Sequence, residues 1–140
     1  MKKKVLFFIV IMLMSVPLSA CLIQNGESLP YNSTVKYTMY IGLNDQDTYT
    51  QLIPYEEAEK KVNEIALKHV DGFTQMQAKG AYKDDEGVVT YENSLVYEFS
   101  AATDEQMKAI MDEVLKELNQ HSILLEKQTV KNTFYEGDVQ

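Results

Sequence analysis

Residues 94–118 read SLVYEFSAATDEQMKAIMDEVLKEL, a strand pattern that runs almost directly into a helix pattern. Leu95, Tyr97 and Phe99 alternate with their neighbours at the period of a strand that buries one face. This alternation is the clearest part of a strand that we predict from Val88 to Ser100.

The second half of the stretch predicts a helix over Thr103–Asn119. Thr103 and Gln106 have the spacing of a capping box, in which each side chain bonds a backbone amide that the first turn leaves unsatisfied. The apolar residues that follow recur at helical spacing, and they are Met107, Ile110, Met111, Val114, Leu115 and Leu118.

The same order of elements occurs upstream. Apolar alternation predicts strands over Val35–Leu43 and Phe73–Tyr82, with a helix over Pro54–His69 between them. Residues 83–87 predict a hairpin turn in which Gly87 adopts positive φ. A last strand is predicted over Ser122–Val130, with a further short edge strand at residues 132–135.

The order strand–helix–strand, hairpin, strand–helix–strand predicts an α+β fold of the ferredoxin-like β-α-β-β-α-β sandwich type. We expect a four-stranded, mixed but mostly antiparallel sheet with both helices on one face, so the other face is bare. Tyr40, Val96 and Glu98 have the parity of that bare face. Our hypothesis is that its tyrosines contact a second subunit or a ligand, and the alternative is that tyrosines merely suit half-buried strands.

The first 21 residues have the pattern of an export signal. Lys2, Lys3 and Lys4 precede an apolar run from Val5 to Met14, which is too short for a permanent membrane span. Leu18-Ser19-Ala20-Cys21 then resembles the bacterial lipobox. The resemblance implies cleavage before Cys21, a lipid on its thiol, and acylation of the new amino terminus, with palmitate as an expected fatty acid. The alternative is an ordinary secretory signal with a cysteine at the cut.

These patterns divide the chain into four parts. Residues 1–20 are the lipoprotein signal peptide, 21–34 a lipidated tether, 35–131 a single α+β domain, and 132–140 a C-terminal tail. The predicted location is the cell membrane of a bacterial cell envelope, on its extracytoplasmic side.

Charge and cysteine content exclude several classes of protein. Removal of the three lysines of the signal changes the formal net charge from −8 to −11, and the chain contains no arginine. Such an acidic domain lacks the cationic side chains that bind nucleic acid phosphates, so we predict no nucleic acid partner. Cys21 is the single cysteine, so no intramolecular disulfide forms and the fold depends on its core.

Few residues have the spacing of known catalytic or metal sites. His69 and His121 lie near predicted helix ends, where capping is the simplest role, and they do not form a metal-binding pair. Asn44–Asp47 resembles a calcium loop only faintly, and a solvated turn explains it. Glu92 and Glu98 are strand carboxylates that act as acid or base if they are buried. We therefore predict no metal, no cofactor and no catalytic residue.

Short motifs follow one another along the chain: Tyr40-Ile41-Gly42-Leu43, Asp71-Gly72-Phe73-Thr74, Ala78-Lys79-Gly80-Ala81-Tyr82, then Glu92 and Ser94. In this order they resemble a family of small secreted bacterial proteins classed as a domain of unknown function. The match runs from about Lys36 to Val130, and it departs from the family at Val70, where an aromatic residue is usual, and in lacking a C-terminal cysteine. The family has no established activity to transfer. The motif residues are Tyr40, Gly42, Asp71, Gly72, Thr74, Gly80, Glu92 and Ser94.

Glycines and turn residues of these motifs have roles in the backbone, whereas Glu92 and Ser94 are the least explained by folding. Together with Tyr40 they are the predicted binding residues. The function predicted first is a membrane-anchored binding module whose open sheet face takes a protein, a peptide or a second copy of the chain. The alternatives are an enzyme with its site at a sheet edge or subunit interface, and a protease-inhibitor-like module.

Overall fold

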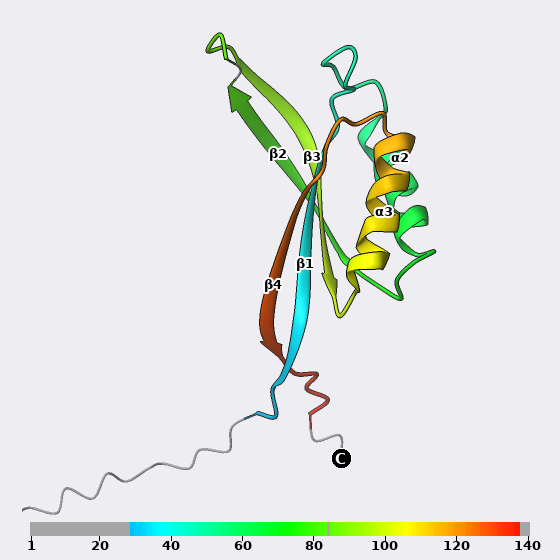
Figure 1. Cartoon of the computed structure of the whole chain (residues 1–140), viewed down its shortest axis with the longest axis vertical. Coiled ribbons are helices and arrows are strands. Elements are labelled where there is room, and N and C mark those ends of the chain that lie inside the picture. Colours follow the sequence, from blue (N-terminus) through cyan, green and yellow to red (C-terminus); the bar gives the residue numbers. More distant parts are fainter. Residues whose placement is uncertain (1–28, 84, 138–140) are drawn as a thin grey trace, which may run out of the picture.

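The computed structural model describes residues 29–83 and 85–137 (Figure 1). The predicted signal peptide, Cys21 and most of the predicted tether lie outside these residues. Among the described residues, no helix has the length and apolar character needed to cross a membrane. The elements in chain order are β1 (Asn32–Gly42), α2 (Tyr55–Ala66), β2 (Thr74–Lys83), β3 (Val89–Ser100), α3 (Asp104–Glu117) and β4 (Leu124–Asn132).

The four strands form one sheet in the order β2-β3-β1-β4. Both helices lie on the same side of this sheet (Figure 1), which confirms the ferredoxin-like α+β arrangement predicted from the sequence. All three strand pairings are antiparallel, so the expected mixed sheet is wrong in that detail. The reason is that β2 pairs with β3 and never with β1, to which it runs parallel.

The core lies between the sheet and the helices, and the alternation in β1 and β3 fills it from the sheet side. Tyr97 is fully buried, its ring stacks on Phe99, and Phe73 meets it edge-on at 5.0 Å between ring centroids. The Tyr97 hydroxyl donates to Asn63 Oδ1 at 2.7 Å, which connects β3 to α2. The apolar stripe predicted for α3 is buried against these side chains at Met107, Ile110 and Val114.

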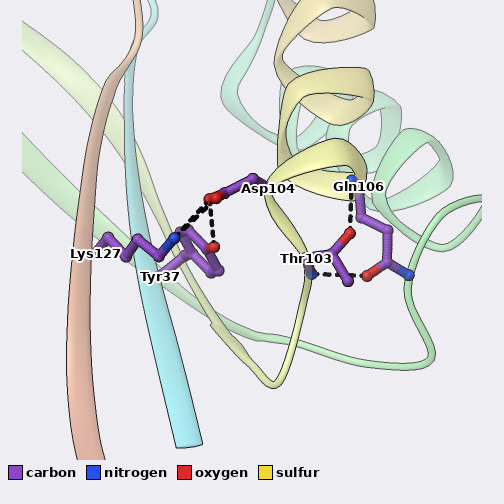
Figure 2. Close-up of polar contacts among 5 residues, drawn as sticks. All are labelled: Tyr37, Thr103, Asp104, Gln106 and Lys127. Carbon is purple, nitrogen blue, oxygen red and sulfur yellow. Dashed lines mark hydrogen bonds and ion pairs between the residues drawn. The ribbon is translucent and has the colours of Figure 1, made fainter.

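The predicted capping box is present at the start of α3 (Figure 2). The backbone N–H of Gln106 donates to Thr103 Oγ1 at 3.2 Å, and the N–H of Thr103 donates to Gln106 Oε1 at 2.9 Å. The same Gln106 side chain donates to the backbone oxygen of His69 at 2.6 Å. Gln106 therefore caps α3 and also bonds the backbone of the segment that follows α2.

We expect Thr103→Ala to lower the free energy of unfolding by about 0.5–2 kcal/mol, because it removes the acceptor for the Gln106 amide. Urea unfolding followed by circular dichroism measures this loss. Thr103→Ser is the matched control, since serine keeps the hydroxyl and caps at least as well. Equal stability of the alanine and serine variants would show that the cap contributes nothing.

A second polar network at the start of α3 joins Asp104 to Tyr37 and Lys127 (Figure 2). The buried Tyr37 on β1 donates its hydroxyl proton to Asp104 Oδ1 at 2.5 Å. Lys127 on β4 contacts both Asp104 oxygens at 2.8 and 2.9 Å, and its Nζ lies 5.4 Å from the centre of the Tyr37 ring. The Lys127 ammonium and then the Tyr37 hydroxyl lower the pKa of Asp104.

A carboxylate with a lowered pKa stabilises the fold above its unfolded pKa, and this stability is lost as the pH falls through the folded pKa. We therefore expect Asp104→Asn to melt at a lower temperature than wild type at pH 7, with the gap closing below about pH 4. Glu105→Gln is the control, because it removes a charge from the same helical turn without touching the network. If both variants lose the same stability at pH 7, the helix dipole explains the effect and the network does not.

All four strands differ from their predicted bounds by one to three residues, and the largest differences are in β1 and β4. β1 begins at Asn32, three residues before Val35, because Asn32, Ser33 and Thr34 pair with the end of β4. This pairing extends β4 to Asn132. The predicted edge strand at 132–135 is wrong beyond Asn132, since residues 133–137 form no strand.

Both helices are shorter than predicted. α2 ends at Ala66, and the chain tightens there because the N–H groups of Lys68 and His69 bond the oxygens of Ile65 and Ala66. The His69 ring lies 2.7 Å from Glu113 on α3, so it joins the two helices where capping was predicted. Gly87 has a φ of 85°, as predicted for the hairpin turn. Lys83, predicted in the turn, belongs to β2, and residue 84 lies outside the described residues.

Candidate functional site

The bare face of the sheet brings together five residues of the sequence motifs. Tyr37, Met39 and Ile41 point into the core, so the alternate residues Tyr40 and Gly42 lie on the open face. Directly opposed residues in a sheet share a face. Gly42 opposes Ser94 in the pairing of β1 with β3, and Gly80 opposes Glu92 in the pairing of β2 with β3.

The Glu92 side chain lies across the sheet over Gly42. A methyl group built at Gly42 would fall 2.5 Å from Glu92 Oε2 and 2.8 Å from Oε1. On the other side, a methyl group at Gly80 would fall 3.5 Å from Glu92 Cγ and 3.3 Å from Ser94 Oγ. We call the seat formed by Gly42, Gly80 and Ser94 the Glu92 cradle. It explains the glycine at position 42, where no side chain fits beneath the carboxylate, whereas the contacts at Gly80 are close to ordinary van der Waals distances.

Glu92 differs from the other two carboxylates on this face. Glu98 accepts from Lys36 Nζ at 2.8 Å, and Glu126 accepts from the Tyr40 hydroxyl at 3.2 Å. Within residues 29–83 and 85–137, no hydrogen bond or ion pair is found for the Glu92 carboxylate. Burial and then the Glu126 charge raise the pKa of Tyr40, so this hydroxyl keeps its proton and donates it. Because Glu92, unlike Glu98 and Glu126, finds no partner among the described residues, both of its carboxylate oxygens are open to a ligand.

The cradle opens into a surface hollow of about 670 Å³. The hollow is lined by the loop after β1, the end of β2, the start of β3 and the α3–β4 connection. These segments lie toward the same end of the sheet (Figure 1). Its volume is in the range of small-molecule sites. The residues that line it are Gly42, Asn44, Asp45, Gln46, Asp47, Tyr49, Tyr82, Glu92, Gln120, His121 and Ser122.

The loop after β1 forms an ordered rim of this hollow. Asp45 Oδ1 accepts from the backbone N–H groups of Asp47 and Thr48, both at 3.0 Å, and Asp45 Oδ2 accepts from Asn119 Nδ2 at 2.7 Å. The Asn119 amide, followed by the backbone donors, lowers the pKa of Asp45. The oxygens that suggested a calcium loop therefore organise a turn. In the described part of the chain, no group of three or more acidic, histidine or cysteine residues is placed to hold a metal ion.

The predicted site residues have different places in this geometry. Glu92 and Ser94 belong to the cradle, whereas Tyr40 lies two residues before Gly42 and contacts Glu126 outside the hollow. Tyr82 and His121 line the hollow and were not predicted as site residues. Only the fold shows them, because they come from the end of β2 and from the α3–β4 connection.

The lining chemistry suits a cation with an apolar part. Glu92 supplies an unpaired negative charge, Tyr82 and Tyr49 supply aromatic surface, and none of the described lining residues is a lysine. His121 adds an imidazole ring whose nitrogens can donate or accept a hydrogen bond.

The open-faced four-stranded sheet with two helices on its other side places the chain among ferredoxin-like α+β proteins. More narrowly, the chain belongs to the family described as "Protein of unknown function (DUF3574)", which matches residues 36–134. This match confirms the resemblance to a domain-of-unknown-function family. No curated protein matches the chain.

Solved structures of similar fold have low sequence identity. A phage SAM lyase in complex with S-methyl-5'-thioadenosine is 20% identical with a TM-score of 0.53, covering 74% of this chain and 93% of the lyase. The same kind of lyase in its apo state is 18% identical with a TM-score of 0.52, covering 78% and 100%. CutA from Synechococcus elongatus complexed with Bis-Tris is 10% identical with a TM-score of 0.50, covering 76% and 90%. These likenesses show the fold alone.

Proposed function

We propose that the protein is a membrane-anchored bacterial lipoprotein that binds a small organic cation at the Glu92 end of its open sheet face. The observation that carries the proposal is the Glu92 carboxylate, which lies over Gly42, finds no partner among the described residues and faces a hollow of about 670 Å³. A charge-assisted hydrogen bond to such a carboxylate contributes about 1.5–3 kcal/mol.

Charge favours a cationic ligand over a second copy of the chain. The strand residues of the open face carry one cation, Lys36, and three carboxylates, Glu92, Glu98 and Glu126. Two such faces packed on one another would bring like charges together and desolvate them, which is unfavourable. A cationic ligand would instead neutralise Glu92, for which the described residues provide no partner.

The anchor rests on the lipobox-like residues before Cys21 and is tested separately from the ligand. Labelled palmitate fed to cells that express the chain should enter the wild-type protein and remain with the membrane fraction. The Cys21→Ser variant should carry no label. A labelled Cys21→Ser protein, or an unlabelled wild type, would contradict lipidation at this residue.

Binding is tested with two probes of similar shape and opposite charge, phenethylammonium and phenylacetate. We expect calorimetric titration of the detergent-solubilised protein to show binding of the ammonium compound and none of the carboxylate. Glu92→Gln should weaken that binding about tenfold or more, because a neutral amide replaces the charged acceptor. Asp71→Asn is the control, since it removes an exposed charge outside the hollow. Equal affinity of the Glu92→Gln variant and wild type would refute the site.

A second candidate function follows from His121, which lines the same hollow as Glu92. A carboxylate and an imidazole on one hollow are a suitable pair for general acid–base catalysis. Because a neighbour of similar fold is named a SAM lyase, S-adenosylmethionine, a sulfonium cation, belongs in the first panel of compounds. Its conversion by wild type, lost in His121→Ala with binding retained, would favour an enzyme; binding without conversion would favour the binding protein.

A further inference from the structure

The end of the sheet opposite the hollow carries exposed apolar side chains on two chain segments. Asn32 opposes Asn132, so the segments before β1 and after β4 leave the sheet at the same end (Figure 1). Their exposed fractions are 44% at Leu29, 56% at Tyr31, 92% at Phe134 and 75% at Tyr135. We call these four residues the aromatic end.

Water is an unfavourable environment for this group. Large apolar side chains that are exposed on two segments at one end of an acidic domain indicate a contact surface. Tyrosine and phenylalanine are favoured at the boundary between lipid headgroups and acyl chains, where the ring is buried and a hydroxyl stays hydrated. The chemistry of the aromatic end therefore fits a lipid surface.

The position of Cys21 in the sequence also indicates that the aromatic end contacts a lipid surface. Ten residues lie between Cys21 and Asn32, and the eleven steps of a fully extended chain reach at most about 40 Å. A lipid on Cys21 would therefore keep the start of β1 within this distance of the bilayer. The hollow at Glu92 lies at the other end of the sheet (Figure 1).

We propose that the aromatic end inserts into the headgroup region of the membrane and orients the domain with the Glu92 hollow away from the bilayer. The inference rests on the lipid anchor proposed above and not on the identity of the ligand. A membrane of low surface charge suits this insertion. The net charge of −11 after residue 20 is repelled by an anionic surface. The aromatic contact then supplies a second attachment beside the lipid.

The chain has no tryptophan, so one introduced indole reports its own environment. Tyr135→Trp places it at the aromatic end, and Tyr91→Trp is the matched control because Tyr91 is also highly exposed but lies on β3 near the hairpin. The lipidated proteins are reconstituted in vesicles of phosphatidylcholine with or without brominated acyl chains. We expect vesicle binding to shift the Tyr135→Trp emission to the blue and bromine to quench it, and we expect neither to change the Tyr91→Trp emission.

Other outcomes overturn the inference in distinguishable ways. Vesicle-bound protein with no quenching in either variant would mean that the anchor holds but the aromatic end stays in water. Quenching in both variants would mean that the domain lies on its side. Protein that does not float with the vesicles would refute the anchor and the inference together, while the cation titration would remain a separate test of Glu92.

Discussion

The Gly42→Ala variant is expected to lose cation binding at least as completely as Glu92→Gln while keeping its stability. The alanine methyl would fall 2.5–2.8 Å from three atoms of the Glu92 carboxyl group, so the carboxylate must leave its seat. A charge-assisted contact that is broken in this way costs about tenfold in affinity or more. Titration with phenethylammonium measures the loss.

The stability of Gly42→Ala follows from the backbone and from what the methyl group meets. The φ of Gly42 lies outside the left-handed region, so alanine fits the strand, where it is about 0.5–1 kcal/mol more favourable than glycine. The atoms in its way belong to the flexible end of Glu92 and not to the core. We expect the free energy of unfolding, measured in urea, to differ from that of wild type by no more than about 1 kcal/mol.

Gly72→Ala is the matched control for this experiment. A methyl group at Gly72 meets no atom within 4 Å, and its φ also permits alanine, so both binding and stability should stay as in wild type. Loss of stability together with binding in Gly42→Ala would mean that the glycine serves the fold. Full binding by Gly42→Ala would mean that the seat of Glu92 has no part in the site.

The fold was predictable because its determinants are local. Alternation at Leu95, Tyr97 and Phe99 and the capping box at Thr103 each depend on residues a few positions apart. The boundaries were less predictable, because they depend on partners far along the chain. Asn32 becomes part of a strand only through its pairing with Asn132, and nothing within either segment shows this.

The candidate site was predictable only in part for the same reason. The motifs indicated Glu92 and Ser94, but the sequence does not show that Gly42 lies beneath the Glu92 carboxylate. That relation requires the register of β1 on β3. Tyr82 and His121 reach the hollow because the β2–β3 hairpin and the α3–β4 connection end at the same place, which is a property of the topology.

Tyr97→Ala is expected to lower the free energy of unfolding by about 3–5 kcal/mol, because it leaves a cavity among fully buried side chains. Its ring packs on Phe73 and Phe99, so both of these rings lose contacts at once. In a domain of this size each kcal/mol lowers the melting temperature by about 4–8 °C.

Tyr97→Phe separates the ring from the hydroxyl, which donates to Asn63 Oδ1 at 2.7 Å. It should cost only about 1 kcal/mol, the net value of one such hydrogen bond. Tyr91→Ala, at an exposed position of the same strand, should change stability by less than about 0.5 kcal/mol. Urea unfolding of the three variants measures the order. The cost of truncating a side chain depends on how completely its neighbours enclose it. If Tyr97→Ala lost no more free energy of unfolding than Tyr91→Ala, the aromatic cluster would therefore not be the centre of the core.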